Sequence, residues 1–409
     1  MALRSRPGPS TPPPSNMTDL QHQATAYSPR VKLINSVEEF TDLSLFWHSS
    51  QWHPCHDYDD VVSAFENPHP NGHPHVFAVM DQGLPISALI GWVKPVVPPW
   101  KLGYKSVTER HRPCLEFPYG ALLGVDPSPS ASSALVSQVL DFVSNGHADY
   151  ALFHYLNVHS NLYEQAKSMP SFRSRDPFSD PVPHYTLSLP ATYEQYVSSR
   201  SKNTRSDIRR HRNKLRKTFG DGARVATFSD VADIDATACA VSEIEAVTWQ
   251  YHSLDQKVTT PREIKGWRDD AKRNRFLAQV LFIDDKPIAF NLGMTYEGRY
   301  DGFYTGYNPE YRKFSPGSYL LAETIENLCA DPNVRLMDLG FSAEQYKKHY
   351  CDYSTERDSV TLFAPNLQGG KIFLLRLLAG GSNIAAKRVL NRLGIFEDIR
   401  QYLRRRKSN

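Results

Sequence analysis

Residues 311–325 read Y-R-K-F-S-P-G-S-Y-L-L-A-E-T-I and follow the aromatic run R-Y-D-G-F-Y-T-G-Y at 299–307. The run is strand-like. The residues after it indicate a helix, because Ser315 is a favourable N-cap and Pro316 suits the first helical position. Apolar residues then recur at helical spacing, at Leu321, Ile325 and Leu328. The stretch therefore predicts a strand that turns through a short corner into a helix, as in α/β proteins.

The corner is a candidate phosphate site. The first N–H groups of a helix have no partner within the helix, and Gly317 leaves the backbone accessible there. Such groups, with the partial positive charge of the helix start, favour phosphate. We therefore take Ser315, Gly317, Ser318 and Tyr319 as candidate binding residues for a phosphate-bearing cosubstrate. The alternative is an ordinary strand–turn–helix corner that binds no ligand.

The composition indicates a globular chain of about two domains. Of its 409 residues, 40% are hydrophobic and 11% aromatic, and no apolar run approaches the ~18 residues that span a bilayer. The five cysteines are scattered without a CxxC pair, which argues against a disulfide framework or a zinc site and favours a reducing, cytoplasmic location. We expect no metal ion and no permanently bound cofactor.

Charge is distributed unevenly along the chain. The net charge is only +3, yet residues 200–217 hold nine basic and one acidic side chain, and residues 371–409 hold ten basic and two acidic ones. The remainder carries 28 basic against 41 acidic residues. An acidic body with two basic segments predicts an anionic partner at a defined place.

Four segments are expected. Residues 1–30, rich in Pro, Ser and Arg, predict disorder. Residues 31–190 and 191–368 each predict an α/β fold with its own central mixed sheet flanked by helices. Residues 369–409 predict a basic helical tail, which would dock on the acidic body or on an anionic surface such as the inner membrane.

The two α/β units share a hairpin pattern. The run V-F-A-V-M-D-Q-G-L-P-I-S-A-L-I-G-W at 76–92 and the run L-A-Q-V-L-F-I-D-D-K-P-I-A-F-N-L-G-M at 277–294 both place two apolar strands around a polar turn. Because the units have similar length and element order, we expect a duplication whose copies meet near residue 190.

Four stretches resemble the GCN5-related N-acetyltransferase (GNAT) superfamily, and within it the CelD-like and FemAB-like acyltransferases, which carry two such folds in tandem. The stretches are S-K-N-T-R-S-D-I-R-R-H-R-N-K-L at 201–215, K-P-I-A-F-N-L-G at 286–293, the Y-N-P-E-Y-R-K-F-S-P-G corner at 307–317, and M-D-L-G-F-S-A-E-Q-Y-K-K at 337–348. The resemblance covers residues ~190–365 and implies an N-acyltransferase with the corner as its pyrophosphate loop.

Three residues are candidates for catalysis. Asp338 lies near the carboxyl end of its strand, where α/β clefts open, and could accept a proton from an amine; otherwise it is a buried residue that caps the following turn. The resemblance implies that Tyr346 donates a proton to the leaving group and that Lys347 stabilises the tetrahedral intermediate. The alternative is an amphipathic helix face. Glu344 is a weaker candidate base.

The donor and the acceptor are left open by the sequence. Pro316 replaces the first small residue of the usual pyrophosphate loop and removes one backbone donor. The resemblance therefore implies acyl-CoA, normally acetyl-CoA, as cosubstrate, or aminoacyl-tRNA as in the FemAB-like relatives. The implied acceptor is an amine on an amino sugar or on a cell-envelope or polysaccharide precursor, with no role for DNA.

The basic segment supplies a last candidate site. Arg205, Arg209 and Arg212 lie at i, i+4 and i+7 of a predicted helix and so share one face. A helix this polar and this positive needs nearby acids or a bound anion. The face is either solvated or contacts a phosphate, tRNA or another polyanion. If the face contacts a polyanion, a different class of function stays open, namely a non-catalytic protein that binds an anionic partner.

Overall fold

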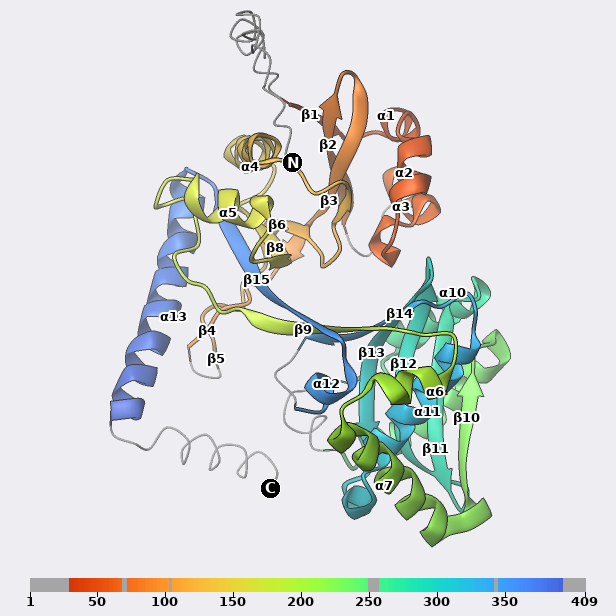
Figure 1. Cartoon of the computed structure of the whole chain (residues 1–409). Coiled ribbons are helices and arrows are strands. Elements are labelled where there is room, and N and C mark those ends of the chain that lie inside the picture. The colour runs from red at the N-terminus through yellow and green to blue at the C-terminus, as the bar shows by residue number, and fades with distance from the viewer. Residues whose placement is uncertain (1–28, 68–71, 103–104, 249–256, 342–344, 393–409) are drawn as a thin grey trace, which may run out of the picture.

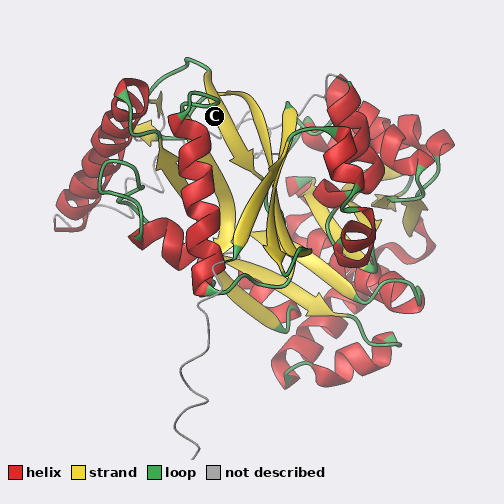
Figure 2. Ribbon diagram, turned by 90° about the horizontal axis from the view of Figure 1, so that it is seen from above, coloured by secondary structure: helices red, strands yellow, loops and turns green. Residues whose placement is uncertain are grey.

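The computed structural model of the chain describes residues 29–67, 72–102, 105–248, 257–341 and 345–392. Its centre is a 13-stranded mixed sheet with helices on both sides (Figures 1 and 2). The predicted α/β class, with a mixed sheet flanked by helices, is confirmed. The segment expected to be disordered, 1–30, lies almost wholly outside the described residues.

We call residues 29–190 the N-terminal half. Its strands are β1 (Arg30–Ile34), β2 (His73–Asp81), β3 (Leu84–Val96), β6 (Arg112–Phe117), β7 (Leu122–Gly124), β8 (Tyr150–Asn157) and β9 (Val182–Ser188), with β4 (Lys101–Leu102) and β5 (Lys105–Ser106) forming a separate ribbon. Its helices are α1 (Val37–Thr41), α2 (Ser44–Ser50), η1 (Pro54–His56), α3 (Tyr58–Glu66), α4 (Pro129–Ser144) and α5 (Asn161–Ser168).

Residues 191–392 form the C-terminal half. Its strands are β10 (Ala223–Phe228), β11 (Phe276–Ile283), β12 (Lys286–Tyr296), β13 (Arg299–Tyr307), β14 (Leu336–Phe341) and β15 (Tyr353–Phe363). Its helices are α6 (Tyr193–Ser199), α7 (Lys202–Phe219), η2 (Gly220–Gly222), η3 (Val231–Asp233), α8 (Ile234–Glu245), α10 (Pro261–Lys272), η4 (Pro309–Phe314), α11 (Pro316–Ala330), α12 (Gln345–Tyr350) and α13 (Leu367–Arg392).

The two halves repeat one pairing scheme. In the N-terminal half β2 pairs antiparallel with β3, β3 antiparallel with β6, and β6 parallel with β8. In the C-terminal half β11, β12, β13 and β14 pair in the same order and with the same directions. A helix connects the parallel strands in each case, α4 in one half and α11 in the other. This repetition agrees with the duplication inferred from the hairpins.

The halves do not have separate sheets, because their last strands are exchanged. β15, from the C-terminal half, pairs with β8 of the N-terminal half, whereas β9, from the N-terminal half, pairs with β14. β9 and β15 also pair with each other and cross the middle of the molecule (Figure 1). The expected pair of separate sheets is therefore corrected to one continuous sheet, joined through these two strands.

The matching hairpins have matching turns. Gln82 and Gly83, between β2 and β3, both have positive φ, of 48° and 83°. Asp284 and Asp285, between β11 and β12, also have positive φ, of 48° and 63°. Two successive residues of positive φ make the type I′ turn, whose twist matches that of a two-stranded hairpin. The polar D-Q-G and D-D-K stretches therefore fix the register of both hairpins.

The described part of the tail, in α13, docks on the N-terminal half. Ile372, Phe373 and Ala379 are buried in a cluster with Trp100 and Tyr150. The Arg376 guanidinium pairs with the buried Asp176 carboxylate at 2.9 Å. The start of the tail therefore lies against the body of the protein, one of the two placements expected from its sequence. Among the described helices, none combines the length and apolar character needed to cross a membrane.

Candidate active site

The candidate site begins where two parallel strands separate. β13 and β14 pair only from Arg299–Leu336 to Asp301–Asp338, after which β13 continues to Tyr307 and β14 to Phe341. A register shift between Leu292 and Gly293 marks the same level of the neighbouring strand β12. Strands that part in this way can expose backbone groups to a ligand placed between them.

The corner that follows β13 forms a helix start, but not by the predicted capping contact. Ser315 has left-handed backbone angles, φ 53° and ψ 53°, and its side chain makes no capping hydrogen bond to the helix. Pro316 does occupy the first turn. The expectation that the Ser315 side chain caps the helix is therefore wrong, because the left-handed backbone differs from the extended conformation of a capping serine. The N–H groups of the first turn of α11 are left without that cap.

Two lysine side chains lie next to Phe314, the residue that precedes this corner. The Lys214 ammonium, on α7, donates to the Lys313 carbonyl at 2.5 Å and lies 5.7 Å from the centre of the Phe314 ring. The Lys313 ammonium lies 5.0 Å from the same ring. Among the described residues, a β-carbon added at Gly317 would come within 4 Å only of the Tyr307 ring, at 3.8 Å, so they leave the backbone open to approach. Positive charge and an open helix start therefore coincide here.

One of the predicted corner residues, Tyr319, points to the interior. Tyr319 is buried in a cluster with Leu215, Leu281 and Leu320, which places it in the core between α7 and the sheet. The corner therefore presents Ser315, Gly317 and Ser318, which are partly exposed, while Tyr319 supports it from behind.

Asp338 lies in a buried cluster that joins the two halves. Its carboxylate is 2.8 Å from His184 Nε2, contacts the Arg299 guanidinium, and accepts from the Tyr119 hydroxyl at 3.4 Å. Arg299 also binds the Asp301 carboxylate at 2.6 Å. We call these five residues the junction cluster. It draws on the turn after β6 and on strands β9, β13 and β14.

The junction cluster keeps Asp338 ionised. Burial by itself raises the pKa of Asp338, but the hydrogen bond from His184 and the nearby Arg299 charge outweigh it and hold this pKa below its ordinary value. The Gly340 N–H also donates to the carboxylate, at 2.6 Å. This is the turn-capping contact weighed as the alternative to a catalytic role. An anion held by this many donors is a weak base, so it positions its neighbours.

Lys347 and Tyr346 follow on α12. Lys347 is 7% exposed, and its ammonium donates to the Phe341 carbonyl, at the end of β14, at 3.4 Å. Tyr346 packs against the apolar cluster that contains Tyr300 and Met337. The lysine is therefore directed to the point where β14 leaves β13. The weaker candidate Glu344 lies outside the described residues.

The three arginines of α7 have different surroundings. Arg212 binds the carboxylates of Glu323 and Glu326 on α11, the former at 2.9 Å. Arg205 donates to the Arg200 carbonyl at 2.8 Å. Arg209 is exposed to solvent. The polar helix thus obtains the acidic neighbours that its sequence required, and only one of the three predicted anion ligands is left facing outward.

Of the junction cluster, only Asp338 was named from the sequence. Arg299 and Asp301 could have been recognised as a buried ion pair, because two opposite charges at alternate positions of an apolar strand share one face. Tyr119 and His184 could not have been recognised from the sequence, since their roles depend on pairing between distant segments.

His53 lies near the junction cluster. Its burial and the neighbouring charges, Arg299 among them, lower its pKa to about 3.

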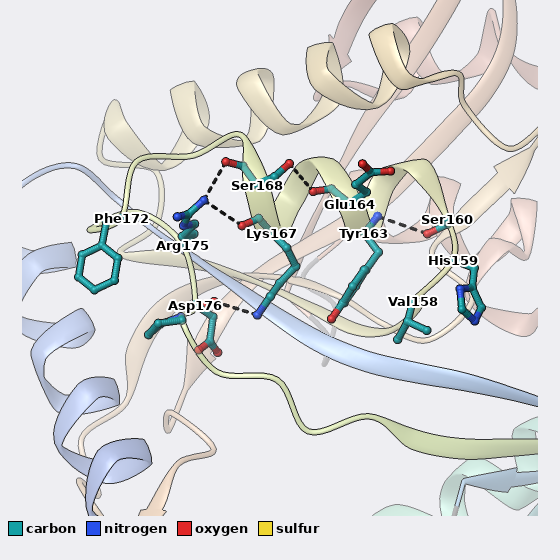
Figure 3. A pocket seen from close by; sticks show the side chains of 11 residues that line it. Val158, His159, Ser160, Tyr163, Glu164, Lys167, Ser168, Phe172, Arg175 and Asp176 are labelled. Atoms are coloured by element: carbon teal, nitrogen blue, oxygen red, sulfur yellow. Dashed lines mark hydrogen bonds between the residues drawn. The ribbon is translucent and has the colours of Figure 1, made fainter. Parts of the chain in front are cut away.

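A 730 Å³ cavity beside α5 is not part of this site (Figure 3). The Lys167 ammonium in it donates to the Asp176 carbonyl at 2.9 Å, and the Arg175 guanidinium donates to the Ser168 carbonyl at 2.8 Å. Both cations that line the cavity are therefore bonded to backbone carbonyls of the protein itself.

Comparison with known proteins bears on the C-terminal half. Residues 202–348 match the sequence family described as the acetyltransferase (GNAT) domain. Among curated proteins, none matches the chain.

Solved structures resemble the chain over most of its length. A conserved protein of unknown function from Bacteroides thetaiotaomicron is 11% identical, with a TM-score of 0.49, and the match covers 81% of this chain and 99% of that one. A tandem GNAT protein from the clavulanic acid biosynthesis pathway is 12% identical, with a TM-score of 0.47 and coverage of 82% and 100%. FemX is 13% identical, with a TM-score of 0.39 and coverage of 80% and 99%.

Proposed function

We propose, from the premise that residues 202–348 form a GNAT acetyltransferase domain, that this chain transfers an acyl group from acyl-CoA to an amine. The amine nitrogen attacks the thioester carbonyl carbon, a C–N bond forms and the C–S bond breaks. The amine loses one proton, and CoA leaves as the thiol. This reaction needs a held donor, a neutral amine and stabilisation of the oxyanion.

One observation carries the proposal. In the C-terminal half, the separation of β13 and β14 lies beside a helix start that the Ser315 side chain does not cap and that has Lys214 and Lys313 next to it. The corner at Ser315–Gly317 suits the donor's phosphates, since backbone N–H groups and positive charge favour them. The separated strands suit the thioester end, because a strand N–H can bond the acyl carbonyl.

Lys347 is the residue we assign to the developing negative charge. Its ammonium already lies at the carbonyl end of β14, next to the strand separation. A cation fixed there stabilises the tetrahedral oxyanion more than the neutral thioester, which lowers the barrier rather than the dissociation constant. Tyr346, its neighbour on α12, is proposed as the proton donor to the leaving thiolate. Asp338 is proposed as a positioning residue, through His184 and Arg299.

Acetyl-CoA is the donor we expect, with an amino sugar or a cell-envelope precursor among the candidate acceptors. An aminoacyl-tRNA donor is the second candidate. The observation that favours it is the exposed basic surface of α7, where Arg209, Arg210 and Lys217 face solvent. A protein that used this surface only to bind a polyanion would show no turnover with either donor.

The test uses purified full-length protein with radiolabelled acetyl-CoA, or with aminoacyl-tRNA, and a panel of amines. We expect Lys347→Ala to lower kcat by about 100-fold or more while the KM for the donor changes little. Lys348→Ala is the matched control, because Lys348 is exposed on the same helix. Equal turnover of the two variants would remove Lys347 from the mechanism. Failure of the wild-type protein to bind or turn over any CoA thioester would refute the proposal.

A further inference from the structure

A second cavity, of about 380 Å³, lies in the N-terminal half where β6 and β8 separate. Trp52, Phe117, Phe153, Tyr155 and Leu122 line its apolar interior. This volume is within the range of small-molecule sites, about 300–1,000 Å³. The cavity occupies the place in the N-terminal half that the β13–β14 separation occupies in the C-terminal half.

The cavity wall carries one acidic side chain, Asp126, and one arginine, Arg357, and the two are not ion-paired in the described structure. The Arg357 guanidinium, on β15, makes only long contacts with polar atoms of the protein, to the Tyr155 carbonyl and the Thr355 hydroxyl, both at 3.4 Å. It also lies 5.3 Å from the centre of the Tyr119 ring. In the part of the chain that the structure describes, no acidic side chain is ion-paired with it. An arginine held among aromatic rings in this way suits a bidentate carboxylate ligand.

The wall beside Arg357 is strained. Tyr155 has a φ of 54°, which is unusual for an aromatic residue, and it lies where the pairing of β8 with β15 shifts register. The Tyr155 N–H is bonded to the Ser359 hydroxyl at 3.3 Å. Bulges and left-handed residues concentrate at ligand sites, where they re-aim a side chain.

The cavity adjoins the proposed acyl-transfer site. The Tyr155 ring stacks on Phe341, the last residue of β14, with ring centres 3.8 Å apart. Trp52, in the cavity wall, lies 5.1 Å from the Arg299 guanidinium of the junction cluster. A ligand bound with its anionic group at Arg357 therefore lies next to the end of β14, where Lys347 and the strand separation meet.

We infer that this cavity binds the acceptor amine, and that the acceptor is an α-amino carboxylate with a large apolar or aromatic side chain. The inference rests on the proposed acyltransferase function. The carboxylate pairs with Arg357, the side chain fills the aromatic interior, and the α-amine remains near β14. Acylation then joins the donor's carbonyl carbon to that amine.

The binding test needs no donor. Full-length protein is titrated by calorimetry with four probes: L-phenylalanine, 3-phenylpropionate, phenethylamine and L-alanine. We expect L-phenylalanine and 3-phenylpropionate to bind. Phenethylamine, which lacks the carboxylate, should bind about tenfold or more weakly. L-Alanine, which lacks the apolar body, should show no measurable heat. Equal affinity for phenylpropionate and phenethylamine, or no binding of either, would overturn the inference.

Variants locate the binding. Arg357→Gln should reduce L-phenylalanine affinity by about tenfold or more, to the level of the decarboxylated probe. Arg224→Gln, on the edge strand β10, is the matched control and should leave affinity unchanged. An unaltered affinity in Arg357→Gln would overturn the assignment, and the wild-type probe series decides the question if that variant does not fold.

Turnover separates this inference from the proposed function. With acetyl-CoA present, formation of N-acetyl-L-phenylalanine supports both. Acetylation of other amines without binding of the aromatic carboxylates would refute the acceptor pocket alone. Carboxylate-dependent binding with no transfer from any CoA thioester would refute the enzyme and leave a binding pocket.

Discussion

The two halves begin their central helices with the same two residues and give them different surroundings. The start of α4 reads Ser128-Pro129-Ser130, and the start of α11 reads Ser315-Pro316-Gly317. The Ser128 hydroxyl accepts from the Ala131 N–H at 3.3 Å, and Asp126 precedes it. Ser315 makes no such contact, and two lysines stand beside it.

The comparison shows how two helices that begin with the same Ser-Pro pair come to have different surroundings at their N-termini. In the N-terminal half the serine closes the helix start and a carboxylate precedes it, so this helix start is a poor site for phosphate. In the C-terminal half the helix start is open and basic. A left-handed serine, a glycine in place of Ser130 and two lysines from nearby segments are enough to make the difference.

The largest expected effect concerns the junction cluster, which links residues of the two halves. Arg299→Met leaves the Asp301 and Asp338 carboxylates buried without their cation, which should lower the free energy of unfolding by about 3–5 kcal/mol. Chemical denaturation measures it. Arg224→Met removes an exposed ion pair on β10, with Asp285, and should cost about 0–1 kcal/mol. An equal loss in the free energy of unfolding for the two variants would mean that the junction cluster does not stabilise the protein more than an exposed ion pair does.

The next effect tests the two helix starts directly. Gly317→Glu places a carboxylate against the donor phosphates and should weaken CoA binding by about 100-fold or more, because like charges brought together cost several kcal/mol. Ser130→Glu makes the matched change at the start of α4 and should leave CoA binding unchanged. Calorimetric titration with CoA measures both. If the two variants bind alike, the donor does not use the α11 corner.

A further effect concerns acid stability, to which two histidines of the N-terminal half should contribute. In the N-terminal half, burial lowers the pKa of His56 and of His75 to about 4. Below pH ~6.5 these two histidines are protonated in the unfolded chain but stay neutral in the folded protein. The free energy of unfolding should therefore fall as the pH is lowered from about 6.5 to 4, by up to ~1.4 kcal/mol per pH unit for each histidine. Urea denaturation across this range measures it.

Two substitutions assign that pH dependence. His56→Gln should flatten the fall in the free energy of unfolding between pH 6.5 and 4. His349→Gln, at an exposed position on α12, should leave the slope as in the wild type. Identical slopes in both variants would show that the buried histidine of the N-terminal half does not set the acid response.

Local features of the fold were predictable from the sequence, and non-local ones were not. The type I′ hairpins and the strand–corner–helix at 299–330 follow from periodicity and turn residues within short windows. The exchange of β9 and β15 leaves no local signal, because each strand is amphipathic in the same way wherever it pairs. The single continuous sheet was missed for that reason.

The candidate site divides along the same line. The corner at Ser315–Gly317 and the residues Tyr346 and Lys347 of α12 belong to sequence motifs, so they could be named from the sequence. Their roles in binding and catalysis stay predictions. The capping contact predicted for Ser315 failed because its left-handed backbone cannot be read from residue type. Arg357 gave no signal at all, since it becomes notable only when β15 places it beside Tyr155 and Tyr119.

The exchanged strands also have a consequence for synthesis on the ribosome. β8 ends at Asn157, and its sheet partner β15 begins at Tyr353. At about 5–20 residues per second, roughly 10–40 s pass between translation of the two. During that interval the nascent N-terminal half exposes the unpaired edge of β8, the kind of edge that templates aggregation. Chaperone demand should therefore peak while the C-terminal half is still being made, and a ribosome stalled before β15 would carry a half-finished sheet.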